Sequence, residues 1–272
     1  MSLAKRYPQI APVCALGLQA KRRLAWHLDS KKYAKRRTPE ALPVTVFRHQ
    51  SLLIRKLGST DLRLQQNKVV NLRLAARRIN TVTIRPGETF SLWKLIGRPT
   101  ARKGYVEGLL LANGEVTSGI GGGLCQMANL LHWMFLHTPL TVTEKFHHGF
   151  DAFPDSGRTV PFGTGATLFY NYVDLQCHNP TDQTFQITVW VTDEHLKGEI
   201  RSDRDIPERY HIIERDHRYL RRTADGKHFR ANRIFRERRE TSTGRPLGEE
   251  LLMDNFCEMK YEPPAEARVE AI

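Results

Sequence analysis

A glycine cluster beside a single cysteine constrains the fold of this chain more than any other feature. Four of the five residues from Gly119 to Gly123 are glycine, and Cys125 stands at the start of an apolar run that reaches residue 137. Glycine loses more backbone freedom on folding than other residues, so a cluster of glycines needs a structural or chemical reason. The apolar run ends before Pro139 and predicts a buried helix that starts at Cys125.

Segments of strand character surround this helix and indicate the fold class. We expect strands within residues 81–84, 89–93, 104–119, 140–146, 166–179 and 184–192, with a hairpin turn at Asn113-Gly114. A second helix is predicted over residues 59–80, with Ser59, Thr60 or Asp61 as its N-cap. Together these elements predict an α+β fold, with a mixed or antiparallel sheet around the buried helix.

Changes in composition along the chain predict three parts. Residues 1–42 read as a basic, helical N-terminal arm, and Thr38 to Pro43 form a linker with two prolines where the arm meets the next part. Residues 43–200 form the expected α+β domain with the glycine loop and Cys125. In residues 201–272 charged and apolar residues alternate around turns such as Asp225-Gly226, as in an antiparallel sheet with one exposed face.

The positive charge lies at one end of the chain. The whole chain carries a net charge of +13, but residues 1–78 hold 18 Lys and Arg against three acidic residues, which is +15. Such a segment can contact an anionic membrane surface, an acidic partner or nucleic acid. The absence of an aromatic stacking pattern disfavours nucleic acid. A set of solvated basic helix faces is the simplest alternative.

The sequence predicts a cytoplasmic protein, with peripheral contact at the inner membrane face as the alternative. The apolar stretch from residue 10 to 20 is interrupted by Pro12 and Gln19, which is poor for a signal peptide. No run of about 18 apolar residues occurs in the sequence. The four cysteines are widely spaced and form no CxxC pair, as is typical of a reducing compartment.

The glycine loop does not fit a known phosphate-binding motif. A Walker-type loop needs a Lys followed by Ser or Thr after its last glycine, and both are missing from "GIGGGLCQ". A dinucleotide fingerprint needs a third glycine where Leu124 stands. We therefore expect no nucleotide and no other cofactor at this loop.

The position of Cys125 favours a nucleophile. At a helix start, unpaired N–H groups and the helix dipole can lower the pKa of a cysteine from about 8.5 to roughly 3.5–7.5. The glycines would let a substrate backbone approach closely. Donors for a developing oxyanion would come from this loop. The residues expected to bind the oxyanion or substrate are Gly121, Gly122, Gly123, Leu124 and Gln126, together with His147.

A cysteine nucleophile needs a base and a group that orients the base. His148 follows Cys125 by 23 residues, and Asp174 lies another 26 residues on. We expect His148 to take the thiol proton and Asp174 to orient the imidazole, as in a papain-like or NlpC/P60-like cysteine enzyme.

Two other interpretations of these residues stay open. Cys125 can be a small buried apolar residue at a helix start. Alternatively, Cys125, His147, His148 and Asp174 could bind a metal ion, but no local spacing fixes two of these ligands together. We therefore expect no metal site.

These residues also carry a resemblance to a known family. The chain resembles the VanW family, named from vancomycin resistance clusters, in its short stand-alone form. The resemblance covers most of residues 43–235. Its strings include "PGETFSLWKLIGRP", "GIGGGLCQMANLLHWMFLHTPLTV", "FPDSGRTVPFGTGATLFYNYVDLQCHN" and "ERDHRYLRR".

The resemblance implies a glycopeptide-resistance or cell-wall context but no established reaction. The recurring residues of the family correspond here to Gly121, Gly122, Gly123, Cys125, Gln126, His148 and Asp174. The segment before His148 departs from the family, because Lys145, Phe146 and Gly149 replace residues that are common there.

Two hypotheses follow. In the first, Cys125 forms a thioester with a cell-wall peptide or precursor, in acyl transfer or amide hydrolysis. In the second, the glycine loop binds a peptide or carboxylate without a covalent step, and the protein is a non-catalytic accessory protein.

Overall fold

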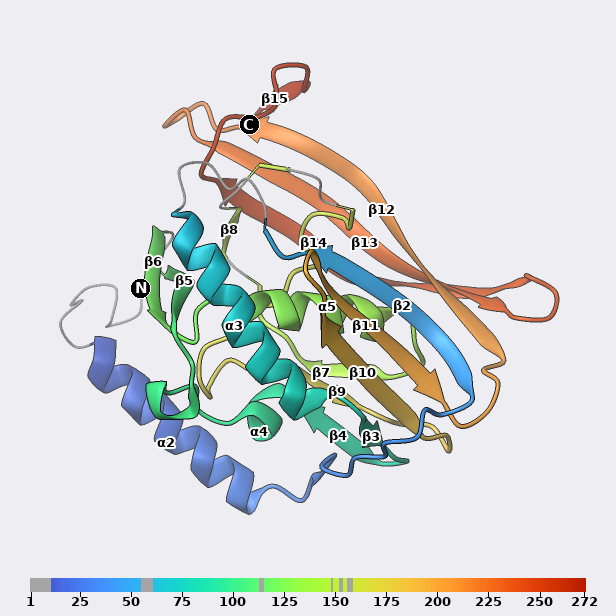
Figure 1. Ribbon diagram of the computed structural model, residues 1–272. Helices are drawn as coiled ribbons and strands as arrows, with labels where there is room; N and C mark the ends of the chain where they lie inside the picture. The colour runs from blue at the N-terminus through green and yellow to red at the C-terminus, as the bar shows by residue number, and fades with distance from the viewer. Residues whose placement is uncertain (1–10, 55–60, 113–114, 148, 152–153, 156–158) are drawn as a thin grey trace.

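A buried helix surrounded by sheets forms the centre of the molecule (Figure 1). The computed structural model describes residues 11–54, 61–112, 115–147, 149–151, 154–155 and 159–272. Helices and several sheets occur together, so the expected α+β class is confirmed. The helical elements are α2 (Ala11–Leu28), α3 (Leu62–Ile79), α4 (Leu92–Ile96), the short 3-10 helix η2 (Ala101–Lys103) and α5 (Cys125–Leu136).

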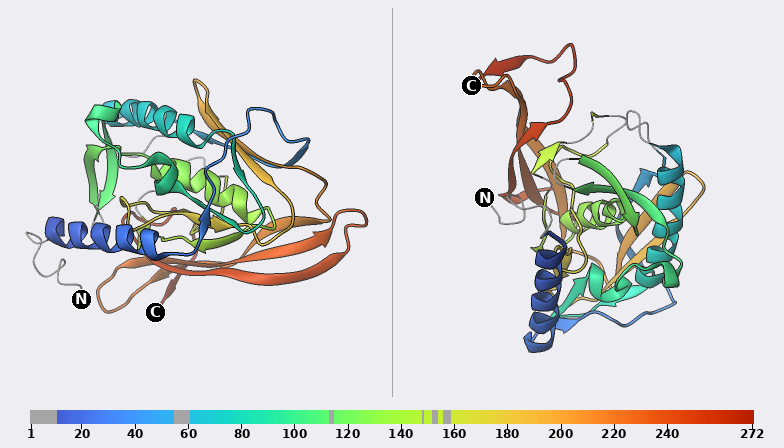
Figure 2. Two further views of the ribbon diagram at one scale, coloured as in Figure 1. Left: turned by 90° about the horizontal axis from the view of Figure 1, so that it is seen from below. Right: turned by 90° about the vertical axis from the view of Figure 1, so that its left-hand side faces the viewer.

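Helix α5 begins at Cys125 as predicted, and most of its side chains are buried. It contains no charged residue, and a helix that is apolar on all sides belongs in a core. Figure 2 shows α5 between α3 on one side and the long C-terminal strands on the other. Helix α3 begins after Asp61, whose carboxylate accepts a hydrogen bond from the Arg63 N–H at 2.8 Å, so Asp61 is the N-cap.

Two four-stranded sheets enclose α5. The first has the order β2-β11-β10-β3, with antiparallel pairing throughout, and its apolar side chains join α3 and α5 in one core. The second has the order β1-β4-β9-β7. The strands are β1 (Lys32–Tyr33), β2 (Val44–Leu52), β3 (Val82–Ile84), β4 (Glu88–Ser91), β7 (Thr141–Glu144), β9 (Gln176–His178), β10 (Phe185–Val191) and β11 (His195–Ser202).

The chain after residue 202 forms a sheet of long antiparallel strands. Its order is β15-β12-β13-β14-β8, and the short strand β8 joins it in parallel from the middle of the chain. A separate two-stranded hairpin, β5-β6, leads into the glycine loop. The strands are β5 (Glu107–Ala112), β6 (Glu115–Ile120), β8 (Phe150–Asp151), β12 (Glu208–Arg221), β13 (His228–Glu240), β14 (Pro246–Met259) and β15 (Val269–Ala271).

Two predicted strands are wrong in extent. Within residues 166–179 only Gln176–His178 form a strand, and the preceding segment contributes an isolated bridge between Phe169 and Val173. Strand β4 ends at Ser91, which then caps α4 by accepting a hydrogen bond from the Lys94 N–H at 3.2 Å. The predicted turn residues Asn113-Gly114 lie outside the described residues.

The boundaries of the three predicted parts stay predictions. The sheet order shows where the parts meet, because β8 from the central part pairs with β14 of the C-terminal part. Within the described residues, no helix combines the length and the apolar composition that crossing a bilayer requires.

Candidate functional site

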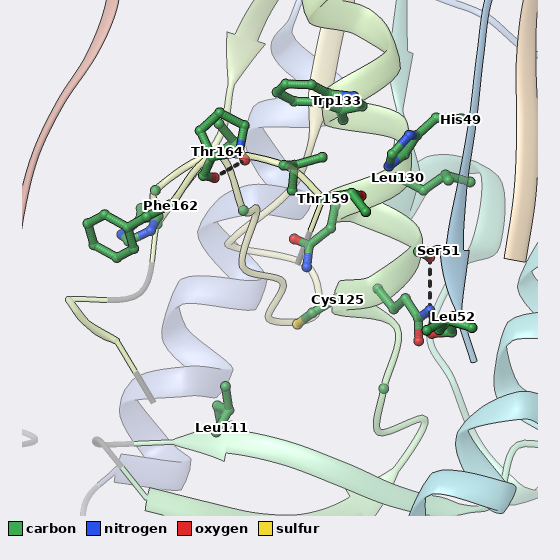
Figure 3. Close-up of a pocket in the computed structure, with 18 of the residues that line it drawn as sticks. His49, Ser51, Leu52, Leu111, Cys125, Leu130, Trp133, Thr159, Phe162 and Thr164 are labelled. Carbon is green, nitrogen blue, oxygen red and sulfur yellow. Dashed lines mark hydrogen bonds between the residues drawn. The ribbon is translucent and has the colours of Figure 1, made fainter. Parts of the chain in front are cut away.

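Cys125 lines a large hollow in the described part of the molecule. The Cys125 cavity measures about 730 Å³ and lies between the start of α5, the end of β2 and the loop after β8. Figure 3 shows the Cys125 side chain directed away from the helix, toward the open space that the labelled residues surround. Its lining includes His49, Ser51, Leu52, Lys68, Leu111, Gly123, Cys125, Gln126, Asn129, Leu130, Trp133, His147, Asp151, Thr159, Phe162 and Thr164.

Burial is the largest influence on the Cys125 thiol among the described residues. The N–H of Leu168 and the N–H of Cys125 itself face the sulfur and favour the thiolate. Burial of the thiol outweighs both and raises its pKa above the ordinary value. Within the described residues desolvation is therefore a larger effect on this pKa than the helix start, and the role of Cys125 as a nucleophile stays a prediction.

Close packing explains most of the glycine cluster. A side chain at Gly122 would place its Cβ 2.1 Å from the backbone carbonyl group of Gly108 in β5. Gly123 has φ +91°, and a Cβ there would lie 2.1 Å from Cγ of Lys68 in α3. The cluster thus lets the loop pass between β5 and α3. Of the three glycines predicted to bind substrate, Gly123 lines the cavity, whereas Gly121 and Gly122 are buried and are not among its lining residues.

Backbone donors remain available at the start of α5. Within the described residues, the N–H groups of Gly123 and Leu124 make no hydrogen bond, and that of Cys125 faces only its own sulfur. The N–H of Gln126 is already used, because it donates to the Gly123 carbonyl at 3.1 Å. A carboxylate or carbonyl oxygen in the cavity would find these donors at a helix N-terminus, where negative charge is favoured.

The side chain of Gln126 holds two elements together. Its Nε2 donates to Oγ of Ser51 at 2.9 Å and to the carbonyl of Leu52 at 2.8 Å. Figure 3 shows the first of these bonds as a dashed line. Both amide hydrogens are occupied, so Gln126 is not a donor for an oxyanion in this conformation. It joins the first turn of α5 to the end of β2.

Asp174 precedes β9 in the chain, and its side chain contacts the first residues of α4. It is not among the residues that line the cavity. Its carboxylate accepts hydrogen bonds from Oγ of Ser91 at 2.6 Å and from the Trp93 N–H at 3.0 Å. The Leu175 N–H and Nε2 of Gln176 donate to it as well. Burial is the largest influence and raises its pKa to about 6. These contacts give Asp174 a structural role in the turn from β4 into α4.

Of the two neighbouring histidines, the structure describes His147 but not His148. His147 lines the cavity, and its Nδ1 lies 3.7 Å from Sγ of Cys257, while its ring packs edge-to-face on Phe162. His148, the predicted base, lies outside the described residues. The triad of Cys125, His148 and Asp174 therefore stays a prediction. No group of three potential metal ligands occurs in the part of the chain that the structure describes.

The sequence did not indicate several residues of the cavity wall. Trp133 faces the cavity from the predicted buried helix, one residue after the buried His132. Lys68 reaches the cavity from α3, although the helical pattern alone suggests a surface position. The loop of residues 159–165 is part of a longer string that carries the family resemblance. Its glycines and prolines are the signal that could have marked it as a binding loop.

Comparison with known proteins identifies the family. Residues 67–201 match the sequence model described as VanW like protein. The chain is 34% identical over 266 residues to the vancomycin B-type resistance protein VanW of Enterococcus faecalis (strain ATCC 700802 / V583), covering 96% of this chain and 94% of that protein. The chain belongs to the VanW family.

A second relative shares a smaller part with this VanW-family protein. The uncharacterized protein YoaR of Bacillus subtilis (strain 168) is 29% identical over 120 residues, covering 43% of this chain and 37% of its own length. No solved structure matches. The family match spans α3 to β11 and includes the glycine loop, Cys125 and Asp174, whereas His49, Ser51 and Leu52 contribute to the cavity from outside it.

Proposed function

We propose that this VanW-family protein binds a cell-wall peptide or its precursor in the Cys125 cavity and serves in glycopeptide resistance. One observation carries the proposal: a cavity of about 730 Å³ meets the start of α5, where the N–H groups of Gly123 and Leu124 have no acceptor within the described residues. A terminal carboxylate or a peptide carbonyl is the ligand group that such donors select. The resistance context comes from the name of the Enterococcus relative.

The walls of the cavity suit a short peptide. Leu130, Trp133 and Phe162 offer apolar surface for small side chains. Asn129 uses its side-chain oxygen to accept the Ala166 N–H at 2.7 Å, and its amide nitrogen donates to no described group. A few polar groups in an apolar hollow are typical of sites for small ligands.

Calorimetric titration with a synthetic peptidoglycan stem pentapeptide tests this proposal. We expect saturable binding by the wild-type protein and at least tenfold weaker binding by Thr159→Trp, which fills the cavity from its exposed rim. Thr143→Trp makes the same change on an exposed position of β7 outside the lining, and we expect it to bind like wild type. Absence of binding, or equal loss in both variants, would contradict the proposal.

A covalent step is the second candidate, because Cys125 lines the cavity with backbone N–H groups facing its sulfur. The sulfur would attack an amide carbonyl carbon to form a C–S bond. The C–N bond would break, and the amine would leave with the thiol proton. Water or a second amine would then release the acyl group from the cysteine.

Thiol alkylation across pH, followed by mass spectrometry, distinguishes the two candidates. An apparent pKa of Cys125 below about 7.5 that rises in His148→Ala would support the covalent step. We expect instead a value at or above the ordinary one in both proteins, because burial raises this pKa. Full biological function of Cys125→Ser would exclude a covalent role.

A further inference from the structure

Helix α2 turns its apolar side outward. Val13, Leu16, Leu24 and Leu28 expose 69%, 58%, 59% and 77% of their surface. With about 100° per residue, these four and Ala20 fall within an arc of roughly 120° on one face of the helix. A surface helix of a soluble protein normally buries such a face. No described residue covers the apolar face of α2, defined by these five residues, and the exposed His27 lies within the same arc.

The opposite side of α2 is held to the protein by a charged residue. The Arg22 guanidinium donates to both carboxylate oxygens of Glu144, at 2.7 and 2.5 Å, and to the Tyr172 carbonyl at 3.1 Å. Trp26 packs beside it against the core. Arg22 therefore fixes which way the helix faces, and its apolar face points away from the body of the protein. Figure 2 shows α2 at the margin of the molecule in both views.

Positive side chains border the apolar face on both sides. Lys21 and Arg23 are exposed, lie about 80° to either side of its centre, and form no ion pair within the described residues. Long cationic side chains beside an apolar stripe are typical of helices that lie in a lipid interface, where the stems contact acyl chains and the charges reach headgroups. The net charge of +15 on residues 1–78 adds long-range attraction to anionic lipid.

We propose that α2 docks this protein on an anionic membrane surface, with its apolar face in the interface and Lys21 and Arg23 at the headgroups. In this arrangement α2 lies along the membrane surface and does not cross the bilayer. It would place the Cys125 cavity close to lipid-bound material, but it does not depend on the proposed function of that cavity.

Vesicle sedimentation tests the docking. We expect the full chain to sediment with vesicles of three parts phosphatidylcholine and one part phosphatidylglycerol, and binding to weaken steeply with salt. Leu16→Ser with Leu24→Ser should reduce partitioning at least tenfold while melting stays unchanged. Leu247→Ser with Leu251→Ser replaces two exposed leucines of β14 and should bind like wild type.

Three outcomes would overturn the docking. They are wild-type protein that stays in the supernatant, Leu16→Ser with Leu24→Ser protein that still sediments fully, and a dimer in light scattering that this pair of substitutions converts to monomer. The last result would assign the apolar face to a second copy of the chain. Lys21→Glu with Arg23→Glu provides an independent variant that leaves the leucines in place and should also lose binding.

A different observation points to an anion site. A cationic cleft of about 320 Å³ lies at the C-terminal end of α3. Its lining residues are Arg37, Leu74, Arg77, Arg78, Ile96, Lys103 and Tyr105. Four of these seven residues are cations and none is acidic. None of the four forms an ion pair in the described part of the chain.

Tyr105 adds a hydroxyl donor to the lining of the cationic cleft. It is 4% exposed, and its hydroxyl makes no hydrogen bond to a described residue. Burial raises the pKa of this hydroxyl, while the positive charge of Arg78 opposes the shift, so the two groups lie close together. The helix dipole of α3 accounts for Arg77 and Arg78 in its last turn. Arg37 and Lys103 come from other segments: Arg37 donates through Nη2 to the Arg78 carbonyl, and Lys103 donates through Nζ to the Arg98 carbonyl at 2.9 Å. Each of these bonds uses one N–H, so both cations keep further donors.

We infer that the cationic cleft binds a phosphate group. Guanidinium groups pair with phosphate oxygens through two parallel hydrogen bonds, and the Tyr105 hydroxyl can donate a further one. The anion would contact cations from the N-terminal segment, α3 and η2 at once and would offset the repulsion between their charges.

Calorimetry with inorganic phosphate and pyrophosphate tests the cleft. We expect saturable binding of pyrophosphate, weakened at least tenfold in Arg77→Ala with Lys103→Ala. Arg73→Ala removes an exposed arginine one turn earlier on α3, outside the lining, and should leave binding unchanged. No binding, or equal loss in Arg73→Ala, would overturn the site.

The same cleft variant in the vesicle assay separates two sources of phosphate. Loss of both pyrophosphate and vesicle binding would identify a lipid headgroup as the ligand. Loss of pyrophosphate binding alone would identify a free phosphate compound. Either result supports the site.

Discussion

The Arg230 guanidinium in β13 donates to the Asp155 carboxylate, with 2.7 Å between Nη2 and Oδ2. Its Nη1 lies 3.4 Å from Oδ2 of Asp151, which also accepts the Tyr261 hydroxyl at 2.6 Å. Asp151 lines the Cys125 cavity, so one buried arginine ties the C-terminal sheet to the cavity wall. The C-terminal strands thereby help to shape the candidate site.

Arg230→Met should destabilise the protein by about 3–5 kcal/mol, because it removes the buried guanidinium that pairs with the buried Asp151 carboxylate. Urea denaturation measures this change. Arg233→Met on the same strand removes a half-exposed pair with Asp216, and we expect a loss of about 1 kcal/mol or less. Equal losses in the two variants would mean that the buried pair contributes no more to the free energy of unfolding than the half-exposed pair.

Gly122→Ala should lower stability by about 1–3 kcal/mol or more, because its Cβ would overlap the Gly108 carbonyl group. Gly149→Ala is the matched control, since no atom lies within 4 Å of the added carbon, and we expect a change within about 0.5 kcal/mol. Thermal melting compares the two. An unchanged melting temperature for Gly122→Ala would show that the loop does not pack on β5 as described.

Asp174→Asn should flatten the dependence of stability on pH between about 4 and 6. The native carboxyl has its pKa raised to about 6, above its value of 3.8 when unperturbed, so the native state holds more protons in this window. Its contribution to stability is therefore present at low pH and falls as pH rises through the window. Guanidinium denaturation at several pH values measures the slope. An identical slope in the variant would contradict the buried, protonated state.

His132 should change the dependence of stability on pH in the direction opposite to that of Asp174. Its Nδ1–H donates to the Thr164 carbonyl at 2.8 Å, and burial with the nearby charge of Lys145 lowers its pKa to about 3. The unfolded state binds the extra proton, so stability is full above about pH 6.5 and is lost as pH falls toward 3. His132→Gln removes this titration, and the acid-induced loss between these values should become shallower. A variant as acid-sensitive as wild type would contradict this prediction.

Local patterns in the sequence were sufficient for the elements whose signals are local. The apolar run after the glycines predicted a helix beginning at Cys125, and the polar residues before residue 62 predicted the cap of α3. Both depend on contacts within one or two turns, which neighbouring residues specify. The strand predicted over 166–179 was wrong for most of its length, because apolar residues also line irregular segments that are buried by tertiary contacts.

The tertiary structure decided the roles of the residues that the sequence had singled out as candidates for the site. The sequence by itself determined that a glycine loop precedes a buried helix with a cysteine at its start, and that the positive charge lies in the first 78 residues. Only the fold decided that Gly122 packs against Gly108 and that burial raises the pKa of Cys125. The fold also decided that Asp174 accepts a hydrogen bond from the first turn of α4. These properties depend on desolvation and close contact between residues far apart in the chain, which no local pattern encodes.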